Sequence, residues 1–169
     1  MIDINIVLIG FMGSGKTTVG KALSNKNNFS FIDTDDLITK EEKKQIPEIF
    51  NEYGEEYFRE LETNVLKELS SNASNNIILS TGGGMVMREK NVKLMNKIGV
   101  IIYLKTTPEV ILKRLQNDNS RPLLKDKSKE NIIKLFNKRE KYYQASGDII
   151  INTNNKSIDK IVKEIEGCI

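Results

Sequence analysis

Short, almost entirely apolar runs alternate along the chain with longer segments in which apolar residues recur at helical spacing. The apolar runs predict strands at residues 4–9, 29–33, 77–80, 100–104 and 149–151. The helical spacing predicts helices at residues 16–26, from 37, at 46–50, 58–69, 89–97, from 108, at 129–143 and at 158–165. Strands that are buried on both faces read as continuous apolar runs, so the alternation indicates a parallel sheet covered by helices. The predicted fold class is therefore α/β.

The chain of 169 residues is long enough for one compact domain with its own core, and it shows no internal repeat. Two polar stretches, around residues 37–60 and 115–127, interrupt the pattern and are expected to stand off that core. The net charge is +3 and the lysines are scattered along the chain. Because nucleic-acid binding needs a clustered basic face, a nucleic-acid partner is not expected.

The composition also excludes several kinds of chemistry. The chain has no histidine, which rules out histidine acid–base catalysis and histidine metal ligands. Its single cysteine, Cys168, cannot form an internal disulfide, which is typical of a reducing compartment. The sequence contains no apolar run of about 18 residues, and residues 1–5 lack the features of a signal peptide. A cytoplasmic protein without a membrane partner is therefore expected.

Residues 10–17, GFMGSGKT, match the pattern of a phosphate-binding loop and follow a predicted strand directly, as that mechanism requires. Glycines allow successive backbone N–H groups to turn towards phosphate oxygens, and the N-terminus of the next helix adds its positive end. Lys16 is expected to reach the β- and γ-phosphates of a nucleotide, and the Thr17 hydroxyl to bind Mg²⁺. Switch GTPases, motor ATPases and small-molecule kinases share this loop, so it predicts nucleotide binding and leaves the class of protein open.

Two carboxylates follow the second predicted strand, in the sequence Asp33-Thr34-Asp35. Side chains alternate along a strand, so the two acids are expected to face the same way. Ligands of open parallel sheets bind beyond the carboxyl ends of the strands. Beside a bound nucleotide, one acid would approach the metal through water and the other would hold the hydroxyl that is phosphorylated. The alternative is that Asp35 and Asp36 only cap a helix that begins at Leu37.

Two arginines are candidates for binding an anionic acceptor. Arg59 and Glu62 are three residues apart in a predicted helix, where they can touch, and a solvated ion pair is the simplest interpretation. Arg139 falls on the apolar stripe of the helix predicted at 129–143. An arginine on such an inward stripe usually reaches a carboxylate or a cleft, so Arg139 is the stronger candidate.

Glycine and arginine also mark two loops. Gly82, Gly83 and Gly84 directly follow a strand, which favours a close approach of the backbone to a ligand or, alternatively, a flexible connector. Arg121, followed by Pro122, lies in the second polar stretch. On its own it would be an exposed loop residue, but near a phosphate-binding loop it is a candidate lid residue that closes on the transferring phosphoryl group.

These motifs follow one another in an order that covers nearly the whole chain. They are the phosphate-binding loop, Asp33-Thr34-Asp35, Ile49-Phe50, Gly54-Glu55, Phe58-Arg59-Glu60-Leu61-Glu62, Gly82-Gly83-Gly84, Arg121-Pro122-Leu123-Leu124, and Arg139 with Tyr142. Taken together, the ordered set resembles the shikimate kinase family. The Phe-Arg-x-x-Glu element between the acid and glycine motifs makes the resemblance specific.

The resemblance implies a three-layer fold like that of nucleoside monophosphate kinases, with a five-stranded parallel sheet in the order 2-3-1-4-5 and helices on both faces. A single kinase domain would span residues 1–169, with a substrate-binding insertion at about 34–62 and a lid at about 115–127. The implied reaction transfers the γ-phosphoryl group of ATP to the 3-hydroxyl of shikimate, in aromatic amino-acid biosynthesis. ATP and shikimate would be the partners, Mg²⁺ the cofactor, and the protein a monomer.

Matching positions give the site residues their implied roles. The catalytic residues would be Lys16, Asp35 and Arg121. The ATP-binding residues would be Gly13, Ser14, Gly15, Lys16, Thr17, Thr18, Arg114, Arg121 and Asn155. The shikimate-binding residues would be Asp35, Arg59, Gly82, Gly83, Gly84 and Arg139, and the residues near the metal would be Thr17 and Asp33.

The chain departs from the family pattern in the substrate-binding insertion. The family usually has a glycine between the acid motif and the Ile-x-x-Ile-Phe element, whereas Lys43-Lys44-Gln45 fills that stretch here. Pro47 stands where a small polar residue is more usual. These departures leave the local shape of the insertion open.

Three other functions share some of these motifs. A gluconate- or nucleotide-type kinase would keep the phosphate-binding loop but would need other roles for the acceptor arginines. A GTPase switch expects an Asn-Lys-x-Asp motif, and the nearest string, residues 137–140, ends in Glu140 inside a predicted helix. A binding module without catalysis would be expected to have lost a catalytic position, and none is lost. Nucleotide preference and turnover of shikimate distinguish these functions.

Overall fold

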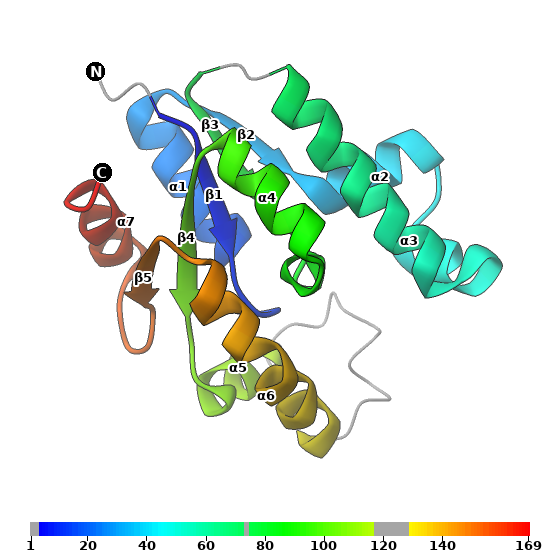
Figure 1. Cartoon of the computed structure of the whole chain (residues 1–169). Coiled ribbons are helices and arrows are strands. Elements are labelled where there is room, and N and C mark those ends of the chain that lie inside the picture. The colour runs from blue at the N-terminus through cyan, green and yellow to red at the C-terminus, as the bar shows by residue number, and fades with distance from the viewer. Residues whose placement is uncertain (1–3, 73–74, 117–128) are drawn as a thin grey trace.

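The protein is described by a computed structural model for residues 4–72, 75–116 and 129–169 (Figure 1). Five strands form one parallel sheet in the order β2-β3-β1-β4-β5. They are β1 (Ile6–Ile9), β2 (Ser30–Asp33), β3 (Ile77–Ser80), β4 (Val100–Lys105) and β5 (Ile149–Asn152). The strand order and the parallel pairing confirm the predicted α/β class and the topology that the family resemblance implied.

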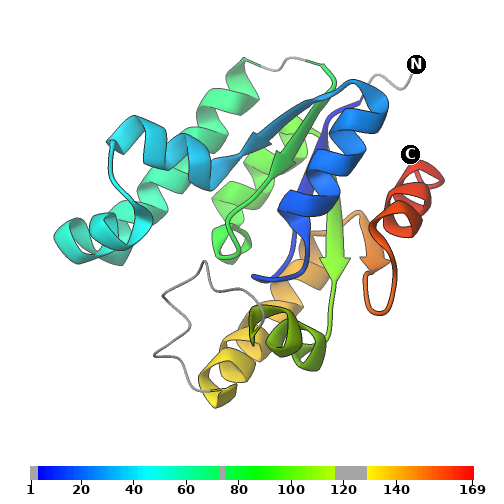
Figure 2. The ribbon, with the colours of Figure 1, turned by 180° about the vertical axis from the view of Figure 1, so that it is seen from behind.

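Helices cover both faces of this sheet (Figures 1 and 2). They are α1 (Lys16–Asn27), α2 (Thr34–Glu42), α3 (Ile46–Ser71), α4 (Glu89–Ile98), α5 (Pro108–Gln116), α6 (Lys129–Ser146) and α7 (Ile158–Glu166), with a 3₁₀ turn, η1 (Met85–Met87). The alternation of side chains along the strands builds a separate core on each face. Val7 and Ile9 pack with residues of α3, α4, α5 and α6, whereas Ile6 and Leu8 pack with α1 and α7. None of the helices within the described ranges is long and apolar enough to cross a membrane.

The start of α2 differs from the prediction. The helix begins at Thr34 rather than at Leu37, and Asp33, not Asp36, caps it, since the Asp33 side chain accepts a hydrogen bond of 3.0 Å from the backbone N–H of Asp35. Asp35 therefore stands in the first helical turn and not on a strand, so strand alternation is the wrong reason for placing the two acids together. The tight connection from β2 to α2 brings them together instead.

The helices α2 and α3 form the insertion and have a small core of their own, built around Ile38, Ile49, Phe58 and Val65. The two helices predicted at 46–50 and 58–69 form a single element, α3, which is interrupted only at Gly54. Gly54 has φ 82° and ψ 175°, a conformation that glycine adopts at little cost. The helix axis changes at this residue, and the segment that carries Arg59 follows it.

The residues that depart from the family pattern form a regular turn between α2 and α3. Lys43 ends α2 in the left-handed conformation, with φ 54° and ψ 30°, which is the conformation for which a glycine would be preferred. Gln45 and Glu48 cap α3 reciprocally, and Pro47 lies in its first turn, where a missing N–H costs nothing. The insertion therefore keeps a compact helix–turn–helix shape without the usual glycine.

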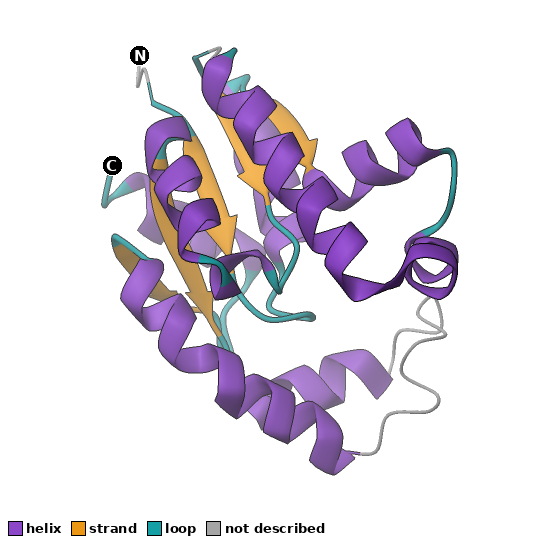
Figure 3. Ribbon diagram, turned by 45° about the vertical axis from the view of Figure 1, so that its right-hand side comes forward, coloured by secondary structure: helices purple, strands orange, loops and turns teal. Residues whose placement is uncertain are grey.

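The insertion and the pair α5–α6 extend past the carboxyl ends of the strands on opposite sides (Figure 3). Ligands of parallel sheets bind in this position, so the architecture itself points to the site. The lid predicted at about 115–127 lies outside the described residues from 117 onwards, and Arg121 lies outside them with it.

Candidate active site

A cavity of about 490 Å³ opens beyond the carboxyl ends of β1, β2 and β3. Its volume is within the range of roughly 300–1,000 Å³ that is usual for small-molecule sites. The predicted site residues that line it are Gly13, Ser14, Gly15, Lys16, Thr17, Thr18, Asp33, Asp35, Gly82, Gly83, Arg114 and Arg139. Phosphate-binding and acceptor-binding candidates, far apart in sequence, therefore share one cavity.

The phosphate-binding loop is shaped by its backbone. Gly13 and Gly15 have φ 77° and 99°, which side chains disfavour, and α1 starts directly after them. The first turn of α1 contains no acidic residue that would occupy its positive end. The Ser14 hydroxyl is buried and has no hydrogen-bond partner among the described residues. A buried polar atom of this kind calls for a further partner, and a phosphate oxygen would provide one.

Lys16 folds over the same loop. Its ammonium group donates hydrogen bonds to the carbonyl oxygens of Gly10, at 2.8 Å, and Phe11, at 3.1 Å. These contacts keep the positive charge next to the mouth of the loop. The lysine is thus positioned beside the place where the terminal phosphates of a nucleotide would lie.

Thr17 and Asp33 meet at the edge of the loop. The Thr17 hydroxyl donates to Oδ2 of Asp33 at 3.2 Å, while Oδ1 of Asp33 is occupied by the cap of α2. Mg²⁺ prefers oxygen ligands and usually keeps several waters, so one hydroxyl and one carboxylate beside a phosphate site suit this ion. The residues present therefore fit the predicted metal.

The far end of the cavity is built by α5 and by the segment between β5 and α7. Arg114 donates to the carbonyl oxygens of Gly13, at 3.0 Å, and Thr153, at 3.3 Å, and burial lowers the pKa of its guanidinium. Asn155 lies in this segment with φ 54°, and Lys156 and Ile158 line the cavity. Ile158 is 41% exposed, and sequence reasoning missed it because a single isoleucine at a helix start has no distinguishing pattern. The flat guanidinium and the exposed apolar side chain suit a planar base.

The acceptor end is organised around the three glycines after β3, each of which lies beside a different group. A Cβ at Gly82 would lie 2.7 Å from Oε1 of Glu62 and 3.1 Å from Oδ1 of Asp35. A Cβ at Gly84 would overlap the guanidinium of Arg59. Close approach therefore favours glycine at Gly82 and Gly84, as one of the two alternatives predicted, whereas a Cβ at Gly83 would make only ordinary contacts.

Arg59 and Glu62 form a buried pair rather than a solvated one. Nη1 of Arg59 lies 2.8 Å from Oε2 of Glu62, whose side chain is 1% exposed, and Nη2 lies 3.0 Å from Oε1 of Glu55. Burial raises the pKa of Glu62, and the charges of Arg59 and Arg139 oppose this shift without cancelling it. Burial lowers the pKa of Arg59, but its acidic partners outweigh that effect and the net shift is upward. Glu62 accepts a hydrogen bond from Nη1 of Arg59 and so holds the guanidinium in place.

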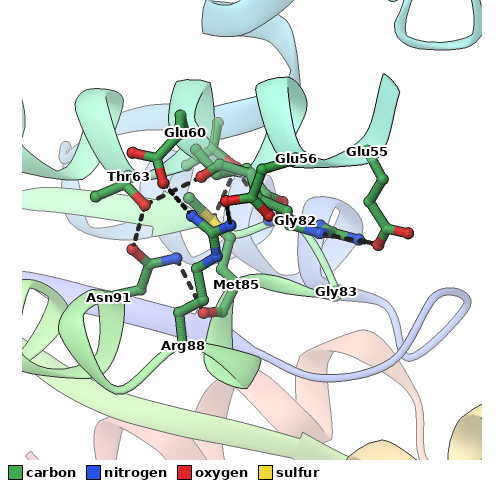
Figure 4. A network of polar contacts seen from close by, with 12 residues as sticks. Glu55, Glu56, Glu60, Thr63, Gly82, Gly83, Met85, Arg88 and Asn91 are labelled. Carbon is green, nitrogen blue, oxygen red and sulfur yellow. Dashed lines mark hydrogen bonds and ion pairs between the residues drawn. The ribbon is translucent and has the colours of Figure 1, made fainter. Parts of the chain in front are cut away.

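A polar network ties α3 to the segment that follows the glycines (Figure 4). Arg88 donates to Oε1 of Glu56, at 2.5 Å, and to Oε1 of Glu60, at 2.6 Å. Deeper in the protein, the Thr63 hydroxyl contacts Oδ1 of Asn91 at 2.8 Å, and Asn91 donates to the carbonyl of Met85 at 3.1 Å. The turn of α3 that carries Arg59 is therefore fixed relative to the glycine segment. No local sequence pattern predicts the contacts between α3 and this segment, because their partners are 28 or 32 residues apart.

Arg139 reaches the same place from α6. The stripe predicted for this helix is confirmed, since Ile132, Phe136 and Tyr143 are buried, and Arg139 lies on it with its guanidinium 6.0 Å from the centre of the Phe11 ring. A Cβ at Gly83 would lie 3.5 Å from Nη1 of Arg139. The two arginines thus flank the glycine run from different helices.

Comparisons with known proteins agree with this geometry. A family model described as shikimate kinase matches residues 12–169. A shikimate kinase of Enterococcus faecalis is 44% identical over 163 residues, which cover 95% of either chain, and one of Persephonella marina is 47% identical over 163 residues, covering 96% of this chain and 97% of the other. The solved structure of a shikimate kinase from Acinetobacter baumannii in complex with shikimate has a TM-score of 0.88 and 35% identity, and the match covers 98% of this chain and 92% of that one. The chain belongs to the shikimate kinase family.

Proposed function

We propose that this protein transfers the γ-phosphoryl group of ATP to the 3-hydroxyl of shikimate. The observation that carries the proposal is that the phosphate-binding loop, Asp35 and Arg139 line one cavity. Arg59 does not line it but lies against Gly84, in the glycine segment whose first two residues do. Family membership makes shikimate the acceptor to test first. The product would be shikimate 3-phosphate, with ADP as the second product.

At the phosphate end, the backbone of Gly13 and Gly15 and the start of α1 would bind phosphate oxygens. Lys16 would stabilise the charge that develops on the transferring group, a form of catalysis that depends on position and electrostatics rather than on a histidine. Arg114, with Asn155 as the further candidate in the β5–α7 segment, would flank the base. Arg121, which lies outside the described residues, stays a prediction as the lid arginine.

At the acceptor end, Arg59 and Arg139 would bind the carboxylate of shikimate. A guanidinium offers a planar pair of donors that matches a carboxylate, so two arginines from different helices suit a substrate with a single acidic group. Asp35 would hold the hydroxyl and help to remove its proton, and the backbone of residues 82–84 would line the pocket. These roles are our assignments for the residues that the family motif matches.

The oxygen atoms of Thr17 and Asp33 would hold Mg²⁺, which would neutralise phosphate charge when bound. We expect a monomer that acts in the cytoplasm and binds neither nucleic acid nor membrane.

The test is a coupled assay of ADP release with ATP and Mg²⁺, using shikimate, gluconate and nucleoside monophosphates as acceptors. We expect turnover with shikimate and a clear preference for ATP over GTP. Turnover with gluconate or a nucleotide instead of shikimate would show that the pocket binds a different acceptor, and the proposal would be wrong. Phosphorus NMR of the product would identify the hydroxyl that is phosphorylated.

A further inference from the structure

Tyr143 lies one helical turn after Arg139 on α6 and is completely buried. Its ring stacks on that of Tyr103 from β4, with 5.3 Å between the ring centres and 22° between the ring planes. A stacked aromatic pair accounts for the burial of the two rings. The stacking does not account for the position of the Tyr143 hydroxyl, which lies next to Gly83 at the acceptor end of the cavity.

The Tyr143 hydroxyl donates a hydrogen bond of 2.5 Å to the carbonyl oxygen of Gly83. A Cβ at Gly83 would lie 3.5 Å from this hydroxyl and also 3.5 Å from Nη1 of Arg139, so the three groups meet at one point. The C=O and N–H of a trans peptide point in opposite directions. Fixing the Gly83 carbonyl therefore also fixes the direction of the Gly84 N–H within a segment of glycines that has little stiffness of its own.

The same hydroxyl interacts with Arg139. Burial raises the pKa of Tyr143 to about 12, and the positive charge of Arg139 and a hydrogen bond from it act against this rise. The phenol therefore keeps its proton at neutral pH and donates it to the Gly83 carbonyl, with the Arg139 guanidinium on the same side of Gly83 as the hydroxyl. One buried atom thus connects an arginine of the cavity to the peptide that faces it.

We infer that Tyr143 is a positioning residue for the acceptor site, because its hydroxyl sets the Gly83–Gly84 peptide and the Arg139 guanidinium relative to each other. The inference rests on the proposed function, since it assumes that this pocket binds shikimate. Tyr143 would not touch the substrate. It acts through Gly83 and Arg139, so its loss would weaken acceptor binding and leave the nucleotide site unchanged.

The test compares Tyr143→Phe with Tyr103→Phe. Each variant removes one buried hydroxyl and keeps the stacked rings, but the Tyr103 hydroxyl has no hydrogen-bond partner among the described residues. Tyr143→Phe is expected to raise KM for shikimate about tenfold, with KM for ATP changed less than about twofold. Tyr103→Phe is expected to leave both constants unchanged. Near-ultraviolet circular dichroism would confirm that both variants are folded at the assay temperature.

A double-mutant cycle with Arg139→Lys separates positioning from a general loss of packing. If Tyr143 acts through Arg139, the two changes together should cost clearly less than the product of their separate effects on KM for shikimate. Equal KM values in the two phenylalanine variants, a parallel rise in KM for ATP, or strictly multiplicative effects in the cycle would each overturn the inference. Absence of shikimate turnover in the wild type is a different result, because it rejects the proposed function itself.

Discussion

The two ends of the cavity are built in different ways. At the phosphate end, left-handed glycines and a helix N-terminus form the site, and Lys16 contacts backbone carbonyls of its own loop. At the acceptor end the main chain contributes three glycines, and charged side chains from the three helices α2, α3 and α6 surround them. The phosphate end therefore depends on the conformation of the main chain, whereas the acceptor end depends on the arrangement of buried charged side chains.

This difference determines how each end responds to mutation. A loop held by its backbone binds phosphate as long as the turn forms. Substituting a single side chain there should therefore lower the reaction rate more than it disturbs the structure of the phosphate site. An arrangement of buried charges depends on every partner, since an unpaired charge in a cavity is costly. The predictions below test this contrast, beginning with the largest expected effect.

Asp35→Asn should lower kcat by about 10²–10⁴-fold, the range usual for loss of a general base. The substitution keeps the size of the side chain and removes the charge that would hold the acceptor hydroxyl. ATP affinity, measured by calorimetry without acceptor, should survive, because the phosphate end is separate. Loss of ATP binding with normal shikimate binding would mean that Asp35 belongs to the other end.

Lys16→Ala should lower kcat by about 10²–10³-fold, as is typical when one electrostatic donor to a transition state is removed. The circular dichroism spectrum should be unchanged, because the loop is held by its glycines and not by this side chain. A variant with near-normal turnover in the coupled assay would contradict the role of the phosphate-binding loop.

Arg139→Lys should lower kcat/KM for shikimate about tenfold or more, since a charge-assisted hydrogen bond is worth roughly 1.5–3 kcal/mol and lysine lacks the planar pair of donors. KM for ATP should change little. A shikimate analogue with a neutral amide in place of the carboxylate should lose affinity in the wild type and lose less in the variant. An equal penalty in both proteins would show that Arg139 does not bind the carboxylate.

The smallest effect concerns the turn between α2 and α3, within the insertion that carries Arg59. Lys43→Gly should raise the free energy of unfolding by about 0.5–1 kcal/mol, because glycine avoids the cost of a left-handed residue but loses more chain entropy. Lys40→Gly, at an exposed position inside α2, should instead lower it by about 1 kcal/mol. Urea unfolding of the two variants measures both values. A destabilised Lys43→Gly would show that the turn carries no strain.

The contrast between the two ends also explains what the sequence could predict. The strands, and the position of the glycine-rich loop between β1 and α1, were predicted correctly because each depends on a short, continuous pattern. The start of α2 was missed because the cap lies inside the strand-like run that ends at Asp33. The burial of the Arg59–Glu62 pair could not be predicted from the neighbouring sequence, since the helical spacing is the same for a buried and a solvated pair. It depends on the glycines at 82–84, which come from another part of the chain.

The three glycines have a consequence for insertions and deletions. Gly82 lies beside Asp35 and Glu62, Gly83 beside Arg139 and Tyr143, and Gly84 beside Arg59, in consecutive order. Removing or adding one residue would move the backbone of the segment relative to these side chains, even though the segment would still be made of glycine. The length of this segment is therefore as constrained as its composition. Variants of altered specificity are better sought in the helices that face the segment than in the segment itself.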